Sequence, residues 1–161
     1  MPAPADAGSM ATKPGHRPAT VAPMPAIPAR HAGTPVIAVA ADDEAMLSSI
    51  KFSLEVEGFA VVTFPDGQAM LNGLDRADWA CIVLDQNMPG FTAMDAVARL
   101  RRDGITVPII LTVSLPSAAL RQSARLGAIE LVEKPLLDDR LIEVIRDLLG
   151  RPPTNVADKR P

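Results

Sequence analysis

Between residues 36 and 149, short runs of aliphatic and β-branched residues alternate with longer amphipathic stretches, five times over. The runs are too short for helices and are bounded by Gly, Pro or Asp, which is typical of buried strands in a parallel sheet. They cover Val36–Ala41, Ala60–Phe64, Cys81–Asp85, Pro108–Val113 and Ile129–Val132. The pattern predicts five strands.

In the stretches between these runs, apolar residues recur three or four positions apart, which indicates helices with one buried face. Glycines stand where three of these helices must stop, as helix-ending glycines do. The apolar series are Met46, Ile50, Leu54; Met94, Val97, Leu100; and Leu137, Leu141, Val144 or Ile145, Leu148; the glycines are Gly58, Gly104 and Gly127.

Five successive βα units predict an α/β fold, a doubly wound five-stranded parallel sheet with helices on both faces. The 161 residues suffice for one core of ordinary size, which we place at residues 35–150. Residues 1–34 hold seven of the sixteen prolines and no apolar run long enough to bury. We therefore expect residues 1–34 and 151–161 to be disordered tails.

Charge and composition exclude several classes of function. The predicted domain carries ten Lys and Arg against seventeen Asp and Glu, a balance of −7 that argues against nucleic acid as the main partner. Both histidines, His16 and His31, precede the domain, so a Ser-His-Asp triad, a His-ligated metal site and a phosphohistidine carrier are excluded. A single cysteine, Cys81, and the lack of a signal peptide or membrane span predict a cytoplasmic protein.

Polar residues that can react or bind ligands stand at the ends of four predicted strands. Ligands of open α/β sheets bind at the carboxyl ends of the strands, so these residues are expected to converge. They are Asp42, Asp43 and Glu44 after the first strand, Asp85 followed by Asn87 at the third, Thr112 at the fourth and Lys134 at the fifth.

Two carboxylates about 4 Å apart repel by about 4 kcal/mol at an effective dielectric of 20, so the cluster predicts a cation. Mg²⁺, an oxygen-seeking ion, and the ammonium of Lys134 would balance it. This set suits phosphoryl transfer, with Asp85 as nucleophile and Thr112 and Lys134 on the phosphoryl oxygens. Asp42 or Asp43 taken alone is equally explained as a helix N-cap, and the coincidence of polar residues at successive strand ends favours a functional site.

The segments Cys81–Gly90 and Val132–Pro135 resemble the phosphoacceptor and lysine segments of the receiver domain of bacterial two-component response regulators. The resemblance implies a flavodoxin-like receiver fold with strand order 2-1-3-4-5. It also implies that Asp85 accepts phosphate from a phosphohistidine, that the Asn87 backbone carbonyl joins the Mg²⁺ shell, and that Lys134 contacts the phosphoryl group. The implied metal ligands are Asp42, Asp43, Asp85 and the carbonyl of Asn87.

Two assignments stay open at this point. The family has an acid pair after the first strand, and spacing from Gly58 selects Ala41 and Asp42, whereas a shift of one residue selects Asp42 and Asp43. The switch hydroxyl is Thr112 when counted back from Lys134, and counting forward from Pro108 selects Val113, which has none; Ser114 is the fallback. The position where relatives often have an aromatic residue holds Leu131.

We therefore expect a stand-alone phosphoacceptor switch, and no enzyme beyond self-catalysed phosphotransfer and autodephosphorylation. The implied partners are a sensor histidine kinase or histidine phosphotransfer protein and a downstream protein target, with no DNA-binding domain and no membrane; a phosphorylation-linked dimer is compatible with the resemblance. One alternative is a pseudo-receiver that binds partners without phosphorylation. The other is an Asp-nucleophile phosphatase of the haloacid-dehalogenase type, which needs a second Asp where this chain has Asn87.

Overall fold

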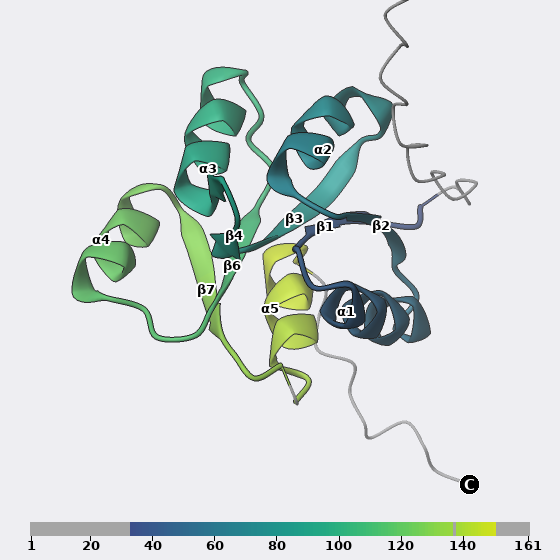
Figure 1. Ribbon diagram of the computed structural model, residues 1–161. Coiled ribbons are helices and arrows are strands. Elements are labelled where there is room, and N and C mark those ends of the chain that lie inside the picture. The colour runs from purple at the N-terminus through teal and green to yellow at the C-terminus, as the bar shows by residue number, and fades with distance from the viewer. Residues whose placement is uncertain (1–32, 137, 151–161) are drawn as a thin grey trace, which may run out of the picture.

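The computed structural model describes residues 33–136 and 138–150, and these form one parallel sheet covered by helices on both faces (Figure 1). The sheet has the order β2-β1-β3-β6-β7, with every neighbouring pair parallel. Counted along this sheet alone, that is the predicted order 2-1-3-4-5, so the fold class is confirmed. The strands are β1 (Val36–Ala40), β2 (Ala60–Phe64), β3 (Trp79–Asp85), β6 (Ile109–Val113) and β7 (Ile129–Glu133).

In this part of the chain four α-helices and a 3₁₀ turn lie between the strands of the sheet, and a fifth helix follows the last strand. Helices α1 and α5 cover one face of the sheet, and α2, α3 and α4 cover the other (Figure 1). The helices are α1 (Glu44–Val56), α2 (Gly67–Asn72), α3 (Ala93–Arg102), α4 (Ala118–Leu126) and α5 (Arg140–Leu148), with the turn η1 (Leu74–Arg76) after α2.

The three central strands, β1, β3 and β6, are buried on both faces, and their side chains alternate between two apolar clusters. On β1, Ile37 and Val39 pack toward α1 and α5, while Val36 and Ala38 pack toward the other three helices. This alternation matters for function, because it decides to which face of the sheet the residue after each strand points.

Three strands, β1, β6 and β7, differ from their predicted bounds by one residue, and three larger details also differ from the sequence prediction. The third strand starts at Trp79, two residues before the predicted Cys81. Gly127 does follow α4, but its φ is −88°, and the left-handed position belongs to Ala128. A short antiparallel hairpin of β4 (Asn87–Met88) and β5 (Phe91–Thr92) was not predicted. The predicted tails and Leu137 lie outside the described residues, apart from Gly33 and Thr34.

Candidate functional site

Three polar side chains at the carboxyl ends of adjacent strands project from the same face of the sheet. Each stands two residues beyond an apolar residue that packs against α1 and α5, so each continues that face. The registers of β3 with β6 and of β6 with β7 place these strand ends side by side. The pairs are Val83 and Asp85, Ile110 and Thr112, and Val132 and Lys134.

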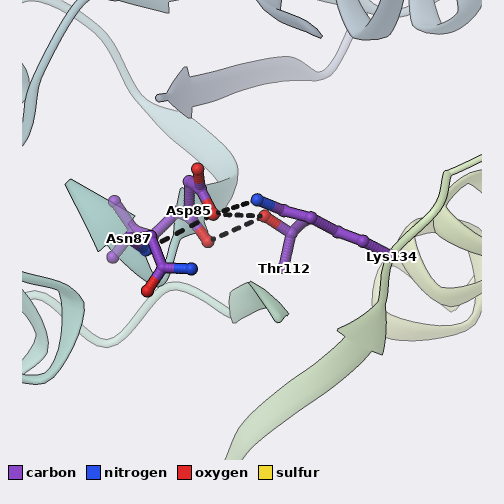
Figure 2. Close-up of polar contacts among 5 residues, drawn as sticks. Asp85, Asn87, Thr112 and Lys134 are labelled. Carbon is purple, nitrogen blue, oxygen red and sulfur yellow. Dashed lines mark hydrogen bonds and ion pairs between the residues drawn. The ribbon is translucent and has the colours of Figure 1, made fainter. Parts of the chain in front are cut away.

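Asp85 lies at the centre of this arrangement and is only 3% exposed. Its Oδ1 lies 2.7 Å from the Nζ of Lys134, and the hydroxyl of Thr112 donates to the same oxygen at 3.4 Å. Figure 2 shows both side chains directed at the carboxylate. The close ammonium contact stabilises a charge that burial alone would penalise.

Local backbone contacts hold the two partners of Asp85 in place. The backbone N–H of Lys134 donates to the carbonyl of Val113 at 2.7 Å, which carries the β7 ladder one residue past the strand. Thr112 is fully buried, and its hydroxyl also lies 3.5 Å from the carbonyl of Leu84. Both Thr112 contacts are long for an O–H···O hydrogen bond, so the hydroxyl can turn to a new acceptor at little cost.

The end of β1 is different. Ala40 pairs with Leu84, so the next residue, Ala41, stands opposite Asp85 in the continued register, and its side chain is buried in the apolar cluster under α1 and α5. Asp42 and Asp43 follow and are exposed. The position facing Asp85 on this strand therefore carries a methyl group in place of a polar side chain.

Asp43 has a structural role in the described geometry. It is the N-cap of α1, and its Oδ1 accepts a hydrogen bond from the backbone N–H of Met46 at 3.0 Å. The sequence argument expected two or three carboxylates to crowd together here. Among the residues that the structure describes, no group of three or more His, Cys, Asp or Glu side chains is placed to hold a metal; a pair of carboxylates beside Asp85 stays a prediction. Asp43 does not join such a group because the helix begins at Glu44 and engages Asp43 as its cap.

Asn87 is held close to Asp85 by the hairpin that follows β3. Its backbone N–H points to Oδ1 of Asp85 at 3.5 Å, and the N–H of Gln86 donates to the carbonyl of Thr112 at 3.0 Å. The turn of the hairpin is Pro89-Gly90, with Gly90 at φ +67°. Pro followed by Gly is a turn signature that the sequence alone could have used to find the hairpin.

The other candidates lie away from the carboxylate. Ser114 is exposed, and Val113 is buried on the opposite face of β6, in the cluster under α2, α3 and α4. Leu131 is half-buried against that same cluster. Burial raises the pKa of the Cys81 thiol to about 12, which rules it out as a nucleophile near neutral pH.

The donor set around Asp85 suits Mg²⁺. That ion binds through one or two carboxylates and keeps several of its waters, so it does not require a closed protein cage. Asp85 supplies one carboxylate, and exposed Asp42 and the backbone carbonyl of Asn87 each lie two residues beyond the neighbouring ends of β1 and β3. These three oxygen donors are of the kind that Mg²⁺ prefers. The Asp43 carboxylate is not counted among them because it caps α1.

Comparison with known proteins agrees with the geometry. The family model described as "Response regulator receiver domain" matches residues 37–146, which includes Asp42, Asp85, Thr112 and Lys134. The chain belongs to the response-regulator receiver family. Of the six candidate site residues in this receiver domain, Asp43 is the one whose side chain caps α1.

Curated relatives of this receiver domain include the transcriptional regulatory protein FixJ of Bradyrhizobium diazoefficiens, which is 35% identical over 109 residues, or 67% of this chain and 53% of FixJ. The transcriptional regulatory protein TctD of Salmonella typhimurium is 33% identical over 70% of this chain and 51% of its own. The chain thus spans about half the length of the curated relatives it matches.

Solved structures show the same fold. The Francisella response regulator 1452 receiver domain superposes with a TM-score of 0.68 at 25% identity, covering 73% of this chain and 98% of that one. Full-length FixJ from B. japonicum gives a TM-score of 0.66 at 32% identity, covering 72% of this chain and 58% of FixJ. No helix in the described ranges is long and apolar enough to cross a membrane.

Proposed function

We propose that this receiver domain is a phosphorylation switch in which Asp85 accepts a phosphoryl group from the phosphohistidine of a sensor kinase or phosphotransfer protein. The observation that carries the proposal is the direct 2.7 Å contact between Lys134 Nζ and Oδ1 of a carboxylate that is almost wholly buried. Buried, cation-paired carboxylates at the carboxyl ends of α/β strands are suited to react with anionic donors.

Phosphoryl transfer to Asp85 needs little from the protein beyond the positioning of the reacting groups and the neutralisation of charge. An Asp85 oxygen attacks phosphorus, a new O–P bond forms as the P–N bond to the donor imidazole breaks, and the imidazole nitrogen takes a proton. Lys134 and the turning hydroxyl of Thr112 neutralise and orient the phosphoryl oxygens. Asp42, Asp85 and the Asn87 backbone carbonyl would hold Mg²⁺, which would further neutralise the charge on the phosphoryl oxygens.

The phosphatase alternative is disfavoured by the residue two positions after the nucleophile. A haloacid-dehalogenase-type phosphatase needs a general acid there, and the Asn87 side chain has no proton to give at neutral pH. We propose that the acyl phosphate accumulates and that turnover is limited to slow autodephosphorylation. The pseudo-receiver alternative rests on one observation, the methyl group of Ala41 opposite Asp85.

Intact-mass measurement after incubation with acetyl phosphate and Mg²⁺ tests the proposal. The wild type should gain one phosphoryl group, and Asp85→Asn, which keeps the shape of the side chain, should gain none. Asp42→Asn should react more slowly than the wild type, because it loses a proposed metal ligand. A wild type that stays unmodified while it binds partners would favour the pseudo-receiver.

The signal would leave the phosphorylated domain through the segment that joins Thr112 to Lys134. A dianionic group on Asp85 draws both partners inward, and the backbone between them follows. Because half-buried Leu131 has no ring to reorient, we expect the linkage to lie at the low end of the 1 to 3 kcal/mol typical of allostery, roughly 1 kcal/mol. Backbone NMR with beryllofluoride should show shifts across residues 113–132; changes confined to the neighbours of Asp85 would contradict this.

A further inference from the structure

The aromatic ring of Phe91 occupies the place where a side chain at position 67 would be. A Cβ added to Gly67 would lie 2.2 Å from Cδ1 and 2.4 Å from Cε1 of that ring. Phe91 belongs to β5, in the hairpin after Asp85, and Gly67 is the first residue of α2, after the carboxyl end of β2. The contact therefore joins the loop beside the nucleophile to a different part of the same sheet edge.

Gly67 is required by this packing and not by its backbone. Its φ is outside the left-handed region, in contrast to Gly58 and Gly104, so any residue could adopt its conformation. It opens α2 directly after Asp66, whose carboxylate caps the helix by accepting from the N–H of Ala69 at 2.7 Å. The Asp66 cap therefore fixes the start of α2, and the Phe91 ring fills the space that the missing side chain of Gly67 leaves.

The hairpin has few other anchors. Met88 is buried in the core, and the hydroxyl of Thr92 accepts from the N–H of Asp95 at 3.1 Å as the N-cap of α3. Asn87 itself is exposed, and its contact with Asp85 is long, at 3.5 Å. The register of the hairpin pairs Asn87 with Thr92 and Met88 with Phe91, so a shift of Phe91 passes directly to the strand that carries Asn87.

We propose that Phe91, seated on Gly67, is a positioning residue that holds the hairpin so that the Asn87 backbone carbonyl stays in reach of a cation bound at Asp85. This inference rests on the proposed function. Removing a residue that positions a metal ligand commonly weakens metal binding about 10- to 100-fold, so we expect at least about a tenfold loss of Mg²⁺ affinity here.

The test is Mg²⁺ affinity measured by calorimetric titration of the full chain, with folding monitored separately by thermal melting in EDTA. Gly67→Ala should weaken Mg²⁺ binding at least about tenfold, because the added methyl group displaces the ring. Phe91→Leu should have a smaller effect alone and should restore much of the lost affinity in the Gly67→Ala background, because the shorter side chain leaves room for the methyl. Such non-additivity is the signature of a direct contact.

Gly127→Ala is the matched control. Its Cβ would meet Cδ1 of Ile129 at 3.0 Å, at the amino end of β7 and away from the site, so it should lower stability without changing Mg²⁺ affinity. Should Gly67→Ala fail to fold, Phe91→Ala tests the same contact by removing the ring, and it should also weaken Mg²⁺ binding. Unchanged Mg²⁺ affinity in folded Gly67→Ala or Phe91→Ala overturns the inference while leaving the proposed function intact; a wild type that binds no Mg²⁺ and accepts no phosphoryl group overturns both.

Discussion

The two halves of the carboxyl edge are built unequally. On β3, β6 and β7 a carboxylate, a hydroxyl and an ammonium continue the same face of the sheet, and the hydroxyl and the ammonium both contact the carboxylate. On β1 the equivalent row ends in the methyl group of Ala41, and the next two acids turn outward to solvent and to the cap of α1. We infer that the first half supplies the covalent chemistry and that the sparser second half, with Asp42 as its one proposed ligand, limits cation affinity.

Removing the ammonium should produce the largest effect on stability. Lys134→Met leaves Asp85 buried without its cation, and breaking one partner of such a pair costs about 3 to 5 kcal/mol. Urea unfolding in EDTA measures it. The double variant Asp85→Asn/Lys134→Met should recover most of the loss, since no charge is then left alone; strictly additive costs would show that the pair is not coupled.

Adding an acid to the sparse half should make the two halves alike. Ala41→Asp places a second carboxylate opposite Asp85, and at about 5 Å with an effective dielectric of 20 the repulsion is roughly 3 kcal/mol. The matched control is Ala41→Asn, which adds the same volume without charge. In EDTA the Asp variant should be less stable than the Asn variant, and Mg²⁺ should narrow the gap. Equal stabilities of the two variants in EDTA would contradict the placement of Ala41 beside the nucleophile.

Mg²⁺ should stabilise the wild type, because it binds the folded site only. At 100 times its dissociation constant the gain is about 2.7 kcal/mol. Thermal melts should show the shift, Asp42→Ala should abolish it, and Asp43→Ala should retain it. Loss of the shift in Asp43→Ala but not in Asp42→Ala would reverse the assignment of the metal ligand.

The smallest effect belongs to the helix cap. Asp43→Ala should lower the free energy of unfolding by about 1 kcal/mol with or without Mg²⁺, because the N–H of Met46 loses its acceptor. Asp43→Ser, which keeps a capping oxygen, is the control and should lie within a few tenths of a kcal/mol of the wild type. A Mg²⁺-dependent cost at this position would indicate that Asp43 also serves the cation.

The sequence predicted the sheet well because strands buried on both faces leave continuous apolar runs that few other structures explain. It also brought Asp85, Thr112 and Lys134 to one edge, since the ends of parallel strands must meet there. Spacing could not decide between Ala41 and Asp43, because one residue of register changes which side chain faces the nucleophile. The register of β1 with β3 and the burial of Ala41 place Ala41 opposite the nucleophile.

The hairpin after Asp85 was missed for a different reason. Strands of two residues are too short to show an alternation of apolar and polar residues. The only sequence signal for the hairpin is its turn, Pro89-Gly90. The packing of Phe91 on Gly67 joins positions that are distant in sequence, and no local pattern encodes that distance. In the sequence, Gly67 is indistinguishable from any glycine at the start of a helix, and its role becomes visible from the position of the Phe91 ring.

Chemical trapping of the phosphorylated residue tests the central claim most directly. Borohydride reduces an aspartyl phosphate to homoserine, so the protein is treated with acetyl phosphate and Mg²⁺, reduced, digested and mapped by peptide mass spectrometry. The account predicts homoserine at position 85 in the wild type and at no position in Asp85→Asn. Homoserine at position 42 or 43, or none in a folded wild type that binds Mg²⁺, would contradict it.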